Sequence, residues 1–186
     1  MTLEQLHKAL KKFKNEKNLF DILLYGSTAQ NSPNPKDTDI LVIFKTGSLK
    51  ERLDCVQRIK KNISSEHNLD IQTVLLEELF SPNFFAKTGV FIDGISIIDN
   101  KPFCHKSGFV SNTIFVFDLK NKTHAQKVKF NYLLAGRTTP GILKHLKGIR
   151  LAAGVIQVHS HNAREFEEIL LKNAIQHTRK NVLVQE

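Results

Sequence analysis

Two acidic residues, separated by a single residue, stand at the start of an apolar stretch of this chain. Asp37 precedes residues 38–44, TDILVIF, and Asp39 is the second residue of this run, which predicts a buried strand. Positions i and i+2 of a strand face the same side, so we expect the two carboxylates to lie next to each other. Like charges held this close repel, and a cation between them relieves the repulsion. The pair therefore predicts a divalent metal site, and Mg²⁺, which takes oxygen ligands, is the expected ion.

A third acid stands in another apolar stretch. Asp70 lies within residues 69–76, LDIQTVLL, which predict a further strand. If this strand neighbours the one at 38–44, Asp70 completes a set of three carboxylates. Such a set can hold two Mg²⁺ ions, with Mn²⁺ as a substitute, one on a triphosphate and one on an attacking hydroxyl. Asp70 would then contact the second metal and help to remove the hydroxyl proton.

A Gly-Ser pair ends the first predicted strand, residues 19–25, LFDILLY. A residue without a side chain lets backbone N–H groups approach a phosphate, and a serine adds a hydroxyl donor. We therefore expect Gly26 and Ser27 to bind the phosphates of an NTP, with ATP as the first candidate. Taken singly, a Gly-Ser pair is a common turn, and Asp-x-Asp is a common loop or cap feature. Their joint occurrence with Asp70 is far rarer, and it predicts in-line transfer of a nucleotidyl group with release of pyrophosphate.

The joint pattern resembles the nucleotidyltransferase superfamily that includes DNA polymerase β, and it looks most like the minimal nucleotidyltransferase branch. Three segments within residues 1–100 carry the resemblance: LLYGSTAQ (23–30), DTDILVIF (37–44) and LDIQTVLLEEL (69–79). The order of the two halves is also similar to predicted archaeal nucleotidyltransferases with a basic C-terminal module, on the segment LLAGRTTPGILKHLKGIRLAAGVIQV (133–158).

The resemblance to the superfamily assigns roles to five residues. It implies that Gly26 and Ser27 contact the nucleotide phosphates, and that the metal ligands are Asp37, Asp39 and Asp70. In one respect the chain departs from the pattern. Many minimal members carry an Arg-Gly pair shortly after the Gly-Ser, at positions equivalent to Gln30 and Asn31 here, and its loss removes a triphosphate contact.

Hydrophobic periodicity predicts the elements that must position these residues. Apolar residues spaced by three and four predict a helix over 2–17, and a second helix is expected over 50–65. A short helix is expected near 83–88, and VFIDGISIID (90–99) predicts a hairpin with its turn at Asp93-Gly94. The expected fold class is α+β: a nucleotidyltransferase-type mixed sheet with flanking helices over residues 1–104, followed by a small basic α+β module over 105–186.

The charge of the chain is concentrated in its second part. Residues 1–104 hold 14 Lys/Arg against 13 Asp/Glu, whereas residues 105–186 hold 13 against 5, a net charge of +8. Such asymmetry indicates a segment that binds a polyanion, and nucleic acid is the expected partner, although a merely basic surface would look the same. The densest basic residues, the expected nucleic-acid contacts, are Lys120, Lys122, Lys127, Lys129, Arg137, Lys144, Lys147 and Arg150.

The same part is expected to alternate strands and helices. Strands are predicted near 113–119, at 150–158 and near 177–184, and helices near 123–134, at 141–147 and at 162–173. Two aromatic residues lie among the basic ones and could stack on bases: Phe130, which is more typical of a core residue, and Tyr132.

Composition narrows the class of protein. With 41% hydrophobic and 24% charged residues, the chain is of ordinary globular type, not disordered, collagen-like or disulfide-rich. No apolar run reaches the roughly 18–20 residues of a membrane span, and the charged N-terminus lacks the apolar segment of a secretory signal. We therefore expect no membrane partner and a cytoplasmic location. Cys55 and Cys104 match no metal-ligand spacing and are expected to be buried, reduced thiols.

These features predict a metal-dependent nucleotidyltransferase that moves an NMP from an NTP to a hydroxyl acceptor, with nucleic acid, and RNA in particular, as the favoured acceptor. Two alternatives remain open at this point. One is an antitoxin-type enzyme that transfers AMP to a partner protein, which would need that partner and show little salt-sensitive RNA binding. The other is a non-catalytic nucleic-acid-binding protein on the same fold, which would bind equally well after replacement of Asp37 or Asp39.

Overall fold

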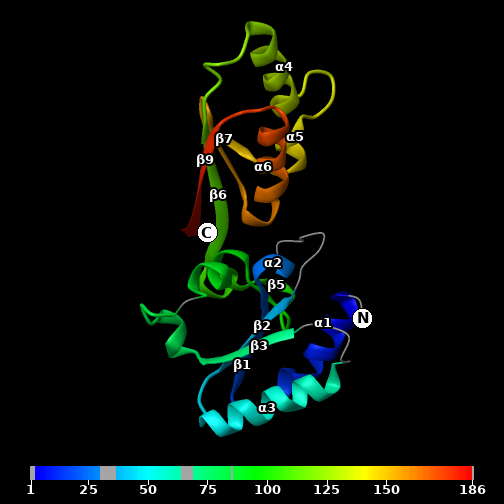
Figure 1. Cartoon of the computed structure of the whole chain (residues 1–186), viewed down its shortest axis with the longest axis vertical. Helices are drawn as coiled ribbons and strands as arrows, with labels where there is room; N and C mark the ends of the chain where they lie inside the picture. Colours follow the sequence, from blue (N-terminus) through cyan, green and yellow to red (C-terminus); the bar gives the residue numbers. More distant parts are fainter. Residues whose placement is uncertain (1–2, 30–36, 64–68, 85, 186) are drawn as a thin grey trace. The chain divides into compact units, whose positions relative to one another are not determined.

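A computed structural model gives the structure of the chain and describes residues 3–29, 37–63, 69–84 and 86–185. The chain divides into two compact units, Met1–Ser107 and Gly108–Glu186. The boundary predicted from the sequence, between residues 104 and 105, lies three residues earlier. Each unit has its own sheet and its own core, and each is described by itself (Figure 1).

The sheet of the first unit is mixed, with strand order β3-β2-β1-β4-β5. Strands β2 and β3 run parallel, and every other neighbouring pair is antiparallel. The bounds of β1 and β2 are those predicted from their continuous apolar runs. The five strands are β1 (Leu19–Tyr25), β2 (Thr38–Phe44), β3 (Leu69–Leu75), β4 (Ile95–Ser96) and β5 (Lys101–Pro102).

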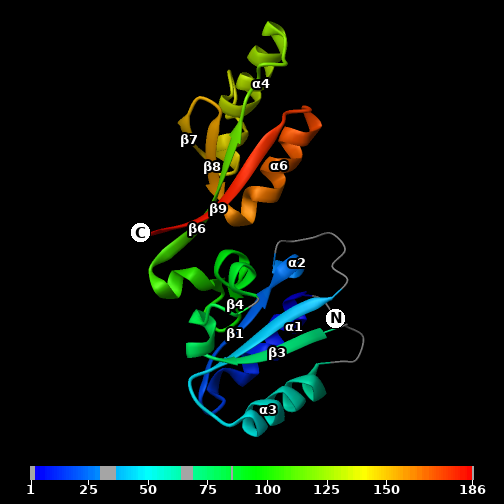
Figure 2. The same cartoon turned by 60° about the vertical axis from the view of Figure 1, so that its left-hand side comes forward.

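Two helices cover one face of this sheet (Figures 1 and 2). Helix α1 (Leu3–Lys11), continued by a 3₁₀ turn at Lys12–Asn15, packs Leu6 and Leu10 against the strands. Helix α3 (Leu49–Asn62) begins with a capping box between Ser48 and Glu51. It contributes Ile59 and the free, buried thiol of Cys55, and Cys104 is likewise free and buried, as predicted.

Short irregular helices cover the opposite face, and here two predictions are wrong. The elements are η2 (Glu77–Phe80), a π-helical turn η3 (Gly89–Asp93) and η4 (Phe103–Ser107). Only Lys87 and Thr88 of the helix predicted near 83–88 are helical, and they lead into η3, while 90–99 is not a hairpin. Neither Asp93 nor Gly94 has a positive φ, whereas the favoured two-residue hairpin turns need one at the first central residue or at both. A Cβ on Gly94 would lie 2.2 Å from the carbonyl oxygen of Val90, so this glycine instead allows the π-helical turn to close.

A buried charge fixes the end of the first unit to its first strand. Asp21 in β1 is fully buried, and its Oδ1 accepts hydrogen bonds from the Ile22 amide (2.8 Å) and from Ser96 Oγ (2.9 Å). Its Oδ2 lies 3.1 Å from Nζ of Lys106, which also pairs with Asp99. Burial raises the pKa of Asp21, and Lys106 and Ser96 oppose that rise.

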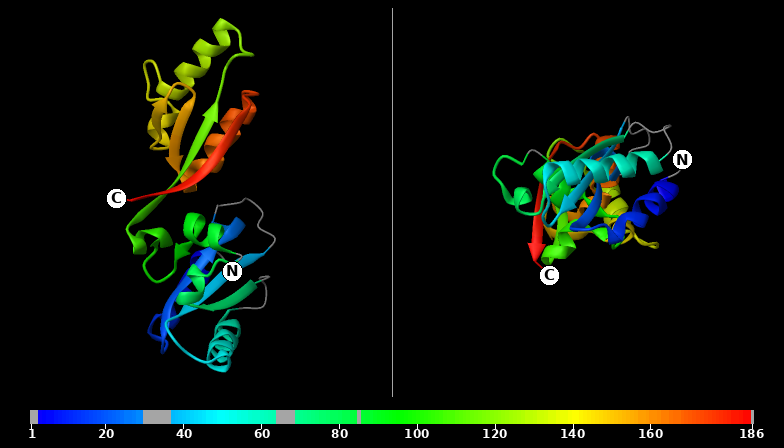
Figure 3. Two further views of the ribbon diagram at one scale, coloured as in Figure 1. Left: turned by 90° about the vertical axis from the view of Figure 1, so that its left-hand side faces the viewer. Right: turned by 90° about the horizontal axis from the view of Figure 1, so that it is seen from below.

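The second unit is an antiparallel sheet with strand order β7-β8-β6-β9. Its helices pack on one face of that sheet around Phe115, Phe130 and Phe166 (Figure 3). Phe130 is therefore a core residue. The strands are β6 (Phe109–Phe117), β7 (Ile149–Ala152), β8 (Val155–His159) and β9 (His177–Gln185). The helices are α4 (His124–Ala135), α5 (Ile142–His145), α6 (Ala163–Lys172) and a 3₁₀ turn, η5 (Ser160–Asn162).

The single strand predicted at 150–158 is wrong, because this segment is the hairpin of β7 and β8. Gly154 lies in its turn with a φ of +74°, a conformation that glycine adopts without strain. The predicted fold class, α+β with a mixed sheet and flanking helices followed by a smaller α+β unit, is confirmed. Within the described ranges, no helix is long and apolar enough to cross a membrane.

Candidate active site

The parallel pairing of β2 with β3 brings two of the predicted metal ligands together. Asp39 and Asp70 are direct partners in the register of the two strands, so their side chains leave the sheet on the same face. The condition set by the sequence, that the third strand neighbours the second, is therefore met. Asp37 precedes β2 and is exposed, as is Asp70, whereas Asp39 is half-buried.

Gly26 lies directly against Asp39. It follows β1 with a φ of +68°, in the left-handed region that favours glycine. A Cβ built on it would lie 2.3 Å from Oδ2 of Asp39, which is far inside van der Waals contact. The Asp39 carboxylate therefore occupies the space that a side chain at residue 26 would fill. Ser27 follows in the four-residue helix α2 (Gly26–Ala29) and is exposed.

Thr28 connects the two chain segments that carry the acids. Its Oγ1 donates a hydrogen bond of 3.1 Å to the backbone carbonyl oxygen of Asp37. This bond fixes the residue before β2 to the helix that follows β1. The segment between them contains Gln30 and Asn31, where the resemblance expects an Arg-Gly pair, and these two residues lie outside the described part of the chain.

The electrostatics of the site are those of acids held together. Burial raises the pKa of Asp39, and the neighbouring charges of Asp70 and then Asp37 raise it further. Tyr25 is buried and pairs with Asp39 across the β1–β2 ladder. Burial, followed by the charges of Asp39 and Asp70, raises its pKa to about 12. Burial is the largest cause of both shifts, and a bound cation would relieve only the part that the neighbouring carboxylates add.

The site supplies oxygen ligands, and these fit Mg²⁺ or Mn²⁺. Two in-register carboxylates match the usual Mg²⁺ site in proteins, where one or two carboxylates combine with substrate phosphates and water. Gln72 donates a hydrogen bond of 3.1 Å to Oδ2 of Asp70 and so orients that carboxylate. No three His, Cys, Asp or Glu side chains of the described residues converge as a complete metal cage. The structure thus pairs Asp39 with Asp70, while Asp37 acts on Asp39 through its charge.

Three residues of this site were not among those selected from the sequence: Tyr25, Thr28 and Gln72. Tyr25 and Thr28 flank the Gly-Ser pair, so its neighbours were the available signal. Gln72 stands two residues after Asp70 in a strand, and this spacing places both side chains on one face.

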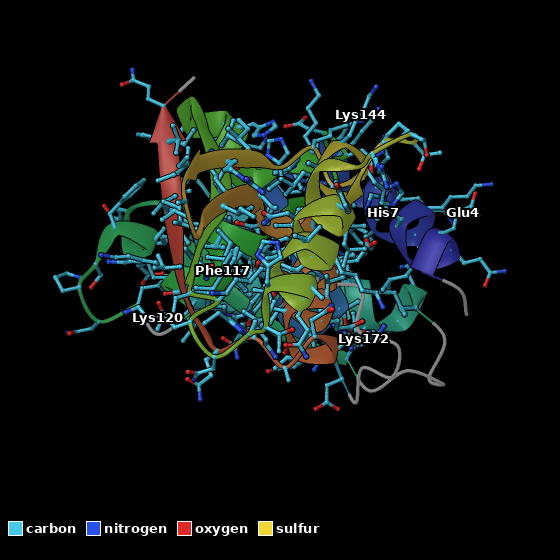
Figure 4. All side chains as sticks on the ribbon, turned by 90° about the horizontal axis from the view of Figure 1, so that it is seen from above. Glu4, His7, Phe117, Lys120, Lys144 and Lys172 are labelled. Atoms are coloured by element: carbon cyan, nitrogen blue, oxygen red, sulfur yellow. The ribbon has the colours of Figure 1, made fainter. Side chains whose placement is uncertain are left out.

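The structure distributes the predicted nucleic-acid contacts over the second unit instead of gathering them at one point. Figure 4 shows Lys120, in the loop before α4, well apart from Lys144 on α5. Two of the residues, Lys129 and Arg137, line one groove, and Arg150 lines a separate pocket. Neither cavity is lined by the remaining five residues, which are Lys120, Lys122, Lys127, Lys144 and Lys147. Two of these five, Lys122 and Lys127, are half-buried.

Comparisons with known proteins identify no family. No protein-family model and no curated protein matches the chain. Among solved structures, the chain is similar to one described as a "putative nucleotidyltransferase from Sulfolobus solfataricus", with 25% sequence identity over 40% of this chain and 71% of that chain. The TM-score is 0.30, and a value this low does not establish a shared fold. The candidate function therefore depends on the geometry of the site.

Proposed function

We propose that this protein is a metal-dependent nucleotidyltransferase that moves an NMP from an NTP, with ATP as the first candidate, to a hydroxyl acceptor. The observation that carries the proposal is the in-register pairing of Asp39 and Asp70 beside the left-handed Gly26. The two carboxylates lie at one end of a sheet, and that of Asp39 packs against the turn at Gly26, whose backbone N–H groups are candidates to bind a phosphate. This is the arrangement that metal-assisted transfer of a phosphorus group requires.

The residues of the site have distinct roles in this proposal. Asp39 and Asp70 would hold Mg²⁺ or Mn²⁺, with Asp37 as the third acid, and the bound ion would neutralise charge that develops on the phosphates. The backbone at Gly26 and the Ser27 hydroxyl would bind the triphosphate. The acceptor oxygen forms a bond to the α-phosphorus while the bond to pyrophosphate breaks, and Asp70 accepts the hydroxyl proton. Thr28 and Gln72 are positioning residues, because they act through Asp37 and Asp70.

Incorporation of label from each α-labelled NTP tests the proposal. The full chain is incubated with Mg²⁺ or Mn²⁺ and with total RNA, a DNA oligonucleotide or protein as the acceptor. We expect incorporation into one acceptor class, and loss of at least about 100-fold in Asp39→Asn, since an interaction with the metal ion would be removed. Asp54→Asn, which removes an exposed carboxylate of α3, is the matched control and should retain activity.

The acceptor that takes up the label separates the alternatives. Label on protein would select the AMP-transferase alternative, and label on a polynucleotide would support the hypothesis that nucleic acid is the acceptor. Absence of label from every acceptor, with nucleic-acid binding unchanged in Asp37→Asn and Asp39→Asn, would reject the enzyme and leave a non-catalytic binding protein on this fold.

A further inference from the structure

A tightly closed loop follows α4 in the second unit. Gly136 ends the helix with a φ of +82° and forms an isolated bridge with Pro140. A Cβ on Gly141 would lie 2.3 Å from both the amide nitrogen of Gly136 and the carbonyl oxygen of Leu134. Only glycine allows backbone segments to approach this closely. The loop therefore has a defined shape, and its residues 137–140 are exposed.

An exposed aromatic ring lies beside this loop. Tyr132 of α4 is 46% exposed, and the guanidinium carbon of Arg137 lies 5.3 Å from its ring centroid. The neighbouring Phe130 and Leu134 are buried in the core, so the helix is fixed independently of Tyr132. A tyrosine that keeps about half of its surface in water and carries a cation at its face offers a stacking surface for a planar base.

The ring and the loop border a groove with a volume of about 610 Å³. No Asp or Glu is present among the described residues that line it. The groove instead combines hydroxyl, aromatic and cationic groups, of which the polar ones are Lys129, Tyr132, Arg137, Thr138, Thr139 and His145. His145 on α5 lies 3.8 Å from Glu165, an exposed acid of α6. The chemistry of the groove matches that of a nucleotide: a flat ring with an anionic phosphate beside it.

A second cavity of this unit is a weaker candidate for a phosphodiester. It has a volume of about 420 Å³ and is lined by Arg150 and Asn131, which hydrogen-bond to each other at 3.3 Å. The exposed acid Asp118 also lines it, and its carboxylate would repel a phosphate. The Arg150 guanidinium is thus already hydrogen-bonded to Asn131, and the cavity carries both a positive and a negative side chain.

We propose that the groove around Tyr132 and Arg137 binds a single-stranded segment of nucleic acid, with one unpaired base stacked on the Tyr132 ring and its phosphate held by Lys129 and Arg137. The inference rests on the proposed function, because it names the acceptor: the strand whose hydroxyl receives the nucleotidyl group. A duplex has its bases stacked and paired internally and offers none to the ring, so the groove selects single strands.

Fluorescence anisotropy with the full chain tests this inference without catalysis. The probes are a short single-stranded RNA, a DNA of the same sequence, and the RNA duplex. We expect both single strands to bind more tightly than the duplex, and a preference between them identifies the sugar that is recognised. Tyr132→Ala should weaken single-strand binding about tenfold, as expected for loss of one base stack, and Tyr132→Phe should restore it. Arg137→Ala should reduce the slope of log affinity against log salt by about 0.7.

Lys180→Ala is the matched control for charge. Lys180 is exposed and pairs with Ile114, so it lies on the sheet face opposite to Phe115 and the helices. Its removal should weaken the binding of all three probes to a similar extent, and it should weaken single-strand binding by less than Tyr132→Ala does. Equal effects of Tyr132→Ala and Lys180→Ala, or equal affinity for duplex and single strand, would overturn the inference. Failure of the proposed function is distinguishable, because binding in Asp39→Asn should equal that of the wild type even if no label is transferred.

Discussion

Oδ2 of Asp39 lies only 2.3 Å from the ideal Cβ position of Gly26, too close for residue 26 to carry a side chain without moving that carboxylate. The two residues belong to segments separated by the β1–β2 connection, yet the position of one depends on the absence of a side chain in the other. Gly26 therefore has two functions in the structure: its φ of +68° turns the chain after β1, and its bare backbone admits the carboxylate.

Substitution of Gly26 should separate these two functions. Gly26→Ala is expected to displace the Asp39 carboxylate and to lower nucleotidyl transfer by about 100-fold or more, because misplacement by 1 Å has this effect in an active site. The matched control is Gly108→Ala. Gly108 has a similar φ of +72° but has no atom within 4 Å of its ideal Cβ position, so both variants carry a backbone cost of about 1–2 kcal/mol. Equal activity of the two variants would contradict the role given to Gly26.

Asp39→Asn should make the metal-free protein slightly more stable. The folded state raises the pKa of Asp39, so it binds more protons than the unfolded state as pH rises from the ordinary value to the raised one. Stability is therefore lost over that window, and the ionised acid destabilises the fold at neutral pH. Asp39 is only half-buried and solvent screens its charge, so we expect a gain of about 0.5 kcal/mol in urea titrations without divalent ions. A large loss would instead indicate a structural acid.

Mg²⁺ should reverse that order of stability. At a concentration ten times the dissociation constant, a bound ion adds about 1.4 kcal/mol to the native state, or roughly 3–5 °C in melting temperature. The wild type should show this rise and Asp39→Asn should not. Asp54→Asn serves as the charge-matched control and should respond as the wild type does. An equal response of all three proteins would mean that Mg²⁺ binds elsewhere.

Tyr25 reports on the same charges. The chain has two tyrosines, so the variant Tyr132→Phe leaves Tyr25 as the only one, and its ionisation can be followed by ultraviolet absorbance. We expect a pKa of about 12, and a lower value when Asp39→Asn or Asp70→Asn is added, because a nearby negative charge disfavours the phenolate. The pKa should stay above the ordinary value in these variants, since burial is the largest cause. An unchanged pKa would place the acids too far from Tyr25.

The buried acid of β1 gives a stability prediction in another part of the first unit. Lys106→Ala removes the cation that lies 3.1 Å from Asp21, and we expect a loss of about 2–3 kcal/mol, or roughly 5–10 °C in melting temperature. Lowering the pH should partly rescue the variant, because protonation of Asp21 removes the unpaired charge. Lys101→Ala, an exposed lysine of β5, should change stability by little. A similar loss in both variants would show that the ion pair contributes nothing specific.

Strands β1 and β2, which carry Gly26 at the end of one and Asp39 in the other, were predictable because buried strands appear as continuous apolar runs in the sequence. Residues 19–25 and 38–44 are continuous apolar runs, and the structure gives β1 and β2 the same bounds. The pairing of Asp39 with Asp70 followed once β3 was placed next to β2, but the sequence could not decide that adjacency, since it is a tertiary choice.

Two of the failed predictions concern glycines whose role depends on the backbone around them. Asp93-Gly94 looks like a hairpin turn, but Gly94 is needed for close approach to Val90 within a π-helical turn. The single strand predicted at 150–158 contains Gly154, which makes the turn between β7 and β8. Asp21 and Lys106 are separated by most of the sequence of the first unit, so no local sequence pattern predicts that they form a buried ion pair.

Lys106 also decides how the chain can be divided. It lies one residue before the end of the first unit at Ser107, and its partner lies in the first strand. A fragment cut at residue 104, the boundary suggested by the sequence, would lose Lys106 and leave a fully buried carboxylate without its cation, whereas a fragment that ends at Ser107 keeps the pair. If the two units are expressed separately, the Lys106–Asp21 ion pair therefore places the end of the first fragment at Ser107 and not at residue 104.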